Sequence, residues 1–145
     1  MKHTHLYLWL VTLMFKTVKK ERQAEDQKVL EKIAPVFDQN FLNQKGKRYC
    51  DKIQMAVRHY ANYLIESERP IMGIAKISKA IQACRQSEEQ VSSLHTSFAM
   101  LCLKAKCFQH SLIIIDHHIT SVMKGTHALE IMTYNYYRGL LYTGL

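Results

Sequence analysis

A residue spacing that recurs along the chain is the feature that most restricts its fold. Ala61 is followed three positions later by Leu64. Ala99 and Cys102 show the same spacing 38 positions further along. Small residues followed at helical spacing by larger apolar ones are typical of helix pairs that pack closely together. The recurrence therefore predicts antiparallel helical hairpins stacked into a solenoid.

Ten residues, most of them at corresponding offsets, are expected to form the contacts within and between the hairpins. They are Ala61, Leu64, Pro70, Gly73, Phe98, Ala99, Cys102, Phe108, Gly139 and Tyr142. Gly139 and Tyr142 begin the series a third time, 40 positions after Ala99 and Cys102. We expect Ala99 and Gly139 to lie close against a neighbouring helix, because small residues let two helices approach each other.

The residue composition favours an all-α fold. Five glycines and two prolines are few for the tight turns of an all-β protein, whereas the abundant Lys, Gln, Leu, Met and Ala favour helices. The β-branched run 112–115 could form a strand on local propensity, but no strand is expected nearby to pair with it. We therefore expect six or seven helices and no sheet.

A single helical-repeat domain is expected over residues 1–145. Its parts are two less regular helices (1–47), a first repeat (48–86), a second repeat (91–124) and an incomplete third repeat (126–145). The offsets place the turn of a third hairpin at the end of the sequence, so the last helix is expected to lack a packing partner. Leu140, Leu141 and Leu145 should then be exposed.

Apolar stripes at helical spacing predict the inward faces of the first and last helices. In the first helix, residues 4–22, the stripe comprises Leu6, Trp9, Leu10 and Leu13. In the last, residues 127–141, it comprises Leu129, Met132, Tyr136 and Leu140. A second helix is expected from Asp26 to Phe41, kinked at Pro35, because proline cannot donate the hydrogen bond of a helix interior.

The chain is basic, with a formal net charge of +8, which would permit contact with nucleic acid or with an acidic protein partner. Its cations cluster within 16–22 and 45–48, as is typical of helix ends, where they interact favourably with the helix dipole. No basic run is interleaved with aromatic residues that could stack on bases. Nucleic acid is therefore not the expected partner. The apolar stretch 6–15 is too short to span a membrane.

No side chains stand at the spacing of a catalytic, cofactor or metal site. His117-His118 lies near Cys102, Cys107 and His110 in the sequence, but adjacent histidines point apart and zinc needs four converging ligands. The four cysteines are expected to be free thiols in a reducing compartment. The tyrosines of 134–142 fit helix packing better than a cage for a ligand cation. We expect no enzymatic activity, no cofactor and no metal.

Three stretches resemble the subunit 3 family of the constitutive photomorphogenesis 9 (COP9) signalosome, a family of PCI-domain scaffolds. They are YLIESERPIMGIAKISKAI, LHTSFAMLCLKAKCF and YNYYRGLLYTGL. The resemblance is in register over 48–107 and 134–145. It is loose over 112–131, where His117-His118 replace acidic residues.

This resemblance implies tetratricopeptide-like repeats in a right-handed solenoid that leads into a winged-helix PCI domain, and the sequence is expected to end before that domain. It implies a non-catalytic scaffold of the cytoplasm and nucleus that assembles with sister signalosome subunits. The complex removes NEDD8 from cullins and so regulates cullin-RING ubiquitin ligases. The zinc-dependent isopeptidase site of the complex belongs to a different subunit.

Two other interpretations stay open. A PCI scaffold of the proteasome lid or of translation initiation factor three would share the repeats, but not the motifs LCLxAKCF and YYxGxxYTGL. A basic helical protein that binds nucleic acid would show tight binding that weakens steeply with salt.

Overall fold

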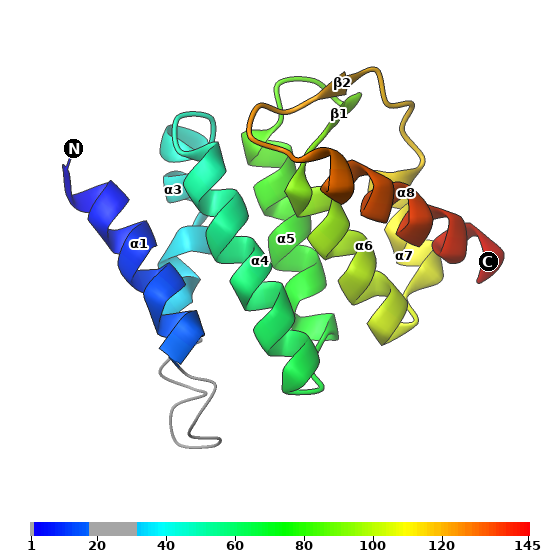
Figure 1. Ribbon diagram of the computed structural model, residues 1–145, viewed down its shortest axis with the longest axis horizontal. Helices are drawn as coiled ribbons and strands as arrows, with labels where there is room; N and C mark the ends of the chain where they lie inside the picture. The colour runs from blue at the N-terminus through cyan, green and yellow to red at the C-terminus, as the bar shows by residue number, and fades with distance from the viewer. Residues whose placement is uncertain (1, 18–31) are drawn as a thin grey trace.

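Seven α-helices form the part of the chain that the computed structural model describes, residues 2–17 and 32–145 (Figure 1). They are α1 (Lys2–Thr17), α3 (Gln39–Lys45), α4 (Cys50–Glu66), α5 (Ile71–Cys84), α6 (Ser93–Ala105), α7 (Phe108–Ile115) and α8 (Ala128–Thr143), with the 3-10 helix η2 (Ala34–Phe37) preceding α3. The prediction of an all-α fold is confirmed, and the run 112–115 is helical within α7.

The helices form two rows. In the first row, α1 packs on α4, α4 on α6, and α6 on α8 (Figure 1). In the second row, η2, α3 and α5 pack together, whereas α7 packs on α6 and α8. The apolar core lies between the rows. Because each helix of the first row packs on its neighbours, α1 and α8 occupy its two ends.

The turns of the two central hairpins have the same backbone geometry, 38 residues apart. Glu68, after α4, and Lys106, after α6, adopt the left-handed conformation with φ of 57° and 55°. In each turn the next residue donates its N–H to the carbonyl five residues back, over 2.8 Å at Arg69 and 2.9 Å at Cys107. This bond satisfies a carbonyl that would otherwise be free at the helix end. The sequence offset is therefore an offset of structure as well.

A small parallel ladder joins the connections at one end of the rows, so the prediction of no sheet is wrong. Strand β1 (Gln90–Val91) pairs with β2 (Ser121–Val122). Val91 and Met123 are buried beside the ladder, and the Met123 N–H donates to the Val91 carbonyl over 2.8 Å. Burial of these two side chains brings together two connections that are distant in sequence.

The predicted inward face of α1 is wrong. Leu6, Trp9 and Leu10 are each 51% exposed, whereas Leu8 and Val11 are buried against the rest of the fold. The helix is apolar on both sides, so a stripe at helical spacing could not identify the side that packs on α4.

The predicted inward face of α8 is wrong for the same reason. Exposed fractions are 73% for Leu129, 68% for Met132, 64% for Tyr136 and 40% for Leu140. The buried side instead contains Tyr134 and Leu141, so the prediction that Leu141 is exposed is also wrong. Glu130 lies on this inward side and forms an ion pair with Arg58 of α4. A hydrophobic pattern assigns a charged residue such as Glu130 to the outer face of a helix, so the sequence did not predict this ion pair.

The second helix is interrupted rather than kinked. Residues 26–31 of the predicted helix lie outside the described part of the chain. Beyond them, Pro35 lies in η2, and the backbone becomes extended at Asp38. Its carboxylate accepts hydrogen bonds from the N–H groups of Asn40 and Phe41 at 3.0 and 3.1 Å. Asp38 therefore caps α3 as a separate helix.

Candidate functional site

Six of the ten predicted packing residues lie in the core where the central hairpins meet. They are Ala61, Leu64, Gly73, Phe98, Ala99 and Cys102, and all are buried. They come from α4, α5 and α6. Pro70 and Phe108 occupy equivalent places, because Pro70 immediately precedes α5 and Phe108 is the first residue of α7.

At Gly73, α5 lies close to both α4 and α6. A Cβ atom added there would lie 2.5 Å from Cδ1 of Leu64 in α4 and 2.6 Å from Cδ1 of Leu101 in α6. Both leucines are fully buried. A glycine at this position therefore lets α5 pack against both neighbouring helices.

Gly139 and Tyr142 do not occupy equivalent places in the third series. Gly139 is exposed, and nothing lies within 4 Å of the position its Cβ would take, so the prediction that it faces a neighbouring helix is wrong for the described chain. The Tyr142 hydroxyl donates to Asp116 Oδ1 at 3.0 Å or to the Ile115 carbonyl at 3.3 Å. Tyr142 thus joins α8 to the end of α7.

A buried glutamine that sequence patterns did not identify holds the β2 segment in place. Gln54 Oε1 accepts hydrogen bonds from Ser93 Oγ at 2.7 Å, from the Ser93 N–H at 3.2 Å and from Thr126 Oγ1 at 3.5 Å. Its Nε2 lies 3.6 Å from the sulfur of Met123. The only sequence signal was a polar residue beside the apolar stripe of α4. Such satisfied buried groups favour one arrangement over alternatives, because leaving them unpaired costs free energy.

His95 is a second buried polar group, at the start of α6. Its Nδ1 accepts the Ser92 N–H at 3.1 Å, and its ring lies edge-on to Tyr134, 5.7 Å between centroids. Burial lowers the pKa of His95 from 6.5 to about 4, and the charges of Arg85 and His117 act in the same direction. The ring is therefore neutral in the folded protein near neutral pH.

The chemistry-bearing residues considered in the sequence are not assembled into a site in the described part of the chain. There, no three His, Cys, Asp or Glu side chains are placed to hold a metal ion. Burial raises the pKa of the Cys84 and Cys102 thiols to about 12, so neither supplies a thiolate near neutral pH. None of the described helices is long and apolar enough to cross a membrane.

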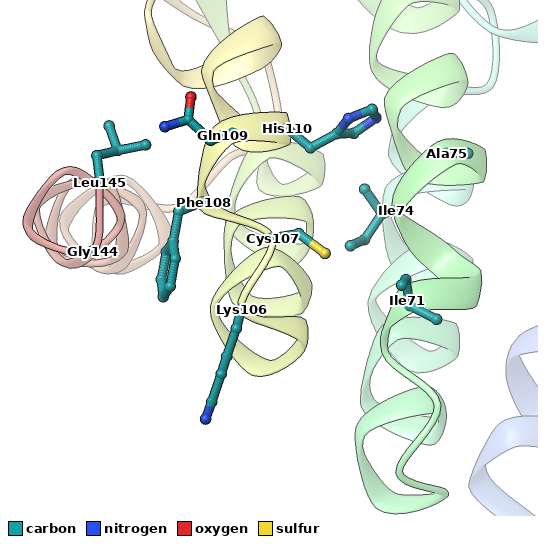
Figure 2. Close-up of a pocket in the computed structure, with 10 residues that line it drawn as sticks. All are labelled: Ile71, Ile74, Ala75, Lys106, Cys107, Phe108, Gln109, His110, Gly144 and Leu145. Carbon is teal, nitrogen blue, oxygen red and sulfur yellow. The ribbon is translucent and has the colours of Figure 1, made fainter.

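The described surface has at least two hollows. One, of about 650 Å³, lies between α5 and the start of α7 (Figure 2). It is lined by Ile71, Ile74, Ala75, Lys106, Cys107, Phe108, Gln109, His110, Gly144 and Leu145. The other, of about 230 Å³, lies between α4, α6 and α8. Cys107 and His110 both line the larger hollow, but the Cys107 thiol donates to the Ala105 carbonyl, 3.6 Å away, rather than to the histidine.

Stacked helical hairpins with equivalent turns define a helical-repeat protein. The family described as COP9 signalosome complex subunit 3, N-terminal helical repeats, matches residues 2–145. The chain therefore belongs to this family. The match spans both central hairpins and both end helices, and it confirms the resemblance of the three motif stretches.

Two curated relatives agree with this assignment. The chain is 28% identical over 91 residues to COP9 signalosome complex subunit 3 of Dictyostelium discoideum, covering 59% of this chain and 22% of that protein. It is 30% identical over 106 residues to the protein of the same name from Drosophila melanogaster, covering 59% and 23%. The chain thus spans under a quarter of the length of these relatives.

The two helical glycines provide a matched test of the packing. We expect Gly73→Ala to lower the free energy of unfolding by up to about 2 kcal/mol, because overpacking against Leu64 and Leu101 costs roughly 1 to 3 kcal/mol and the helical preference of alanine offsets roughly 0.5 to 1 kcal/mol of it. Gly139→Ala should raise it by roughly 0.5 to 1 kcal/mol, because alanine is favoured in an open helical position. Urea denaturation measures both. Equal effects of the two changes would contradict the assigned contacts.

The stability of the protein should depend on pH through His95. The unfolded chain binds a proton on this residue below 6.5, whereas the folded chain does so only below about 4. Stability is therefore retained above the unfolded pKa and lost as the pH falls. Between pH 6.5 and about pH 5 the free energy of unfolding should fall by roughly 1 to 2 kcal/mol. Urea denaturation at each pH measures it. His95→Gln should flatten this slope, and His118→Gln, at an exposed position, should leave it unchanged.

Proposed function

We propose that the chain is a non-catalytic scaffold segment of signalosome subunit 3, which acts by binding other proteins along its helical rows. Family membership supports this function. The observation that most directly supports it is the outer face of α8, where Leu129, Met132, Tyr136 and Leu140 are exposed. Large exposed apolar patches are typical of protein–protein contact.

The α8 face is suited to receiving another helix. Its residues stand at helical spacing and include no charged side chain, and Gly139 lies among them with open space above it. A helix packed there could approach the α8 backbone closely at this glycine. At the opposite end of the row, the exposed side of α1 contains Leu6, Trp9 and Leu10. Both ends of the row are therefore suited to further packing.

The finer features of the proposal follow from the family resemblance. The rows would form a tetratricopeptide-like, right-handed solenoid divided at 48–86, 91–124 and 126–145, and family members continue into a winged-helix PCI domain. The partners would be sister signalosome subunits in the cytoplasm and nucleus. Through them the chain would act indirectly on cullin-RING ligases, from whose cullins the complex removes NEDD8.

The other interpretations have less support. The family match favours signalosome subunit 3 over scaffolds of the proteasome lid or of translation initiation factor three. The only observation that supports nucleic-acid binding is the net charge of +8. It would be recognised by an affinity that falls steeply as salt is raised.

Assembly through the α8 face can be tested by co-expressing the tagged chain with sister subunits. We expect the subunits to elute with the chain in gel filtration, and we expect Leu129→Glu with Tyr136→Glu to abolish their retention, because two carboxylates would be desolvated in an apolar contact. Gln82→Glu with Gln86→Glu adds the same charge at exposed positions and should have no effect. Without sister subunits, the wild-type chain should self-associate and the α8 variant should sediment as a monomer. Retention of sister subunits by the α8 variant would contradict the proposal.

The expected absence of a zinc site and of hydrolytic activity can be tested separately on the purified chain. We expect no stoichiometric zinc and no hydrolysis of a NEDD8 conjugate, since the described residues include no set of three His, Cys, Asp or Glu side chains placed to hold a metal ion. Elemental analysis and a cleavage assay measure the two. About one zinc per chain, lost on changing His117 or Cys107, would overturn this expectation.

A further inference from the structure

The groove between α5 and α7 has an apolar floor. Figure 2 shows Ile74 of α5 facing Cys107 at the start of α7, with His110 pointing across toward α5, whereas the side chain of Ile71 extends away from Cys107. Ile74 is buried, whereas Ile71 is 65% exposed. The groove stays open because α5 and α7 make almost no direct contact within the described chain.

No aspartate or glutamate side chain lines this groove. Residues 70–84 and 90–115, which include α5, α6 and α7, contain no aspartate or glutamate. Lys106 lines the groove, and in Figure 2 its side chain extends away from α5. Lys79 is exposed one helical turn beyond Ala75, on the same side of α5. Lys106 is therefore the lysine that lines the groove, and Lys79 is an exposed lysine of α5 outside its lining.

The size of the groove suits a short peptide. Its volume of about 650 Å³ lies within the usual range of roughly 300 to 1,000 Å³ for ligand sites. From Ile71 to Lys79 the helix rises about 12 Å, so an occupant of two to three helical turns would reach both lysines. A nucleic acid would leave the isoleucine floor without an apolar partner, whereas an amphipathic helix would cover it.

From this combination we propose that the groove between α5 and α7 binds an acidic amphipathic helix of a partner protein. Apolar side chains of that helix cover Ile71 and Ile74, and its carboxylates pair with Lys79 and Lys106. The inference rests on the scaffold function proposed above and specifies one docking surface of that scaffold, distinct from the α8 face.

Cys107 provides a direct readout of occupancy. It is half-buried in the groove, whereas Cys84 and Cys102 are fully buried. In the full chain with Cys50→Ser, labelling by a maleimide therefore reports mainly on Cys107. The probe is a synthetic helix of about 14 residues, or roughly four turns, with leucine along one face and glutamate elsewhere. We expect this peptide to slow the labelling of Cys107 in a saturable way, with an affinity that falls as salt is raised.

Charge variants distinguish specific binding of the peptide in the groove from nonspecific binding. Lys79→Glu with Lys106→Glu should weaken the peptide by about tenfold or more, because attraction at both lysines becomes repulsion. Lys124→Glu, at an exposed lysine of the connection before α8, should change the affinity far less. A peptide with lysine in place of glutamate should give no protection.

Several outcomes would overturn the proposal. These are no protection by the acidic peptide, equal protection by the lysine peptide, or equal protection by polyuridine or by vesicles containing phosphatidylserine. The failure of this inference differs from that of the scaffold function. If sister subunits co-elute with the chain but the peptide does not protect Cys107, the groove proposal alone is wrong. If the peptide protects Cys107 but no subunit co-elutes, the scaffold proposal alone is wrong.

Discussion

The close packing of α5 against α4 and α6 at Gly73 is the contact on which the two-row arrangement depends. With Leu64 and Leu101 fully buried on either side, space for a side chain is missing at this position. Interhelical distance depends on the side chains at the contact. A larger residue would require the buried side chains of Leu64 and Leu101 to shift. The placement of α1 and α8 depends on this contact in turn, because they pack on α4 and α6.

The central hairpins were predictable from sequence because local and tertiary requirements coincide there. The spacing from Ala61 to Leu64 and from Ala99 to Cys102 reflects residues that are buried in the structure, and the turns that follow share their hydrogen bonding. A repeated hairpin gives the same residue spacing twice in the sequence, which makes the spacing easier to recognise than in a single hairpin. Family membership was predictable for the same reason, since the recognised motifs lie mainly in these hairpins and in α8.

The ends of the rows were not predictable from periodicity, and the reason is physical. α1 and α8 are apolar on two sides, so the strongest stripe in each was assigned inward although it lies outward. What orients α8 includes the Arg58–Glu130 ion pair and the burial of Tyr134, neither of which a hydrophobic pattern reveals. The β1–β2 ladder and the Gln54 cluster were missed because each joins segments distant in sequence through only a few residues.

The error in assigning the end helices bears directly on function. A helix with apolar residues on two opposite sides can pack on a neighbour and still present a second apolar face, which is what an element inside a longer stack or an assembly requires. The α5–α7 groove differs, because its apolar floor is accompanied by lysines that would favour acidic partners over others. The α8 face, being uncharged, offers shape and apolar area but little charge selectivity. The scaffold that we propose would thus hold one partner by packing and select another by charge.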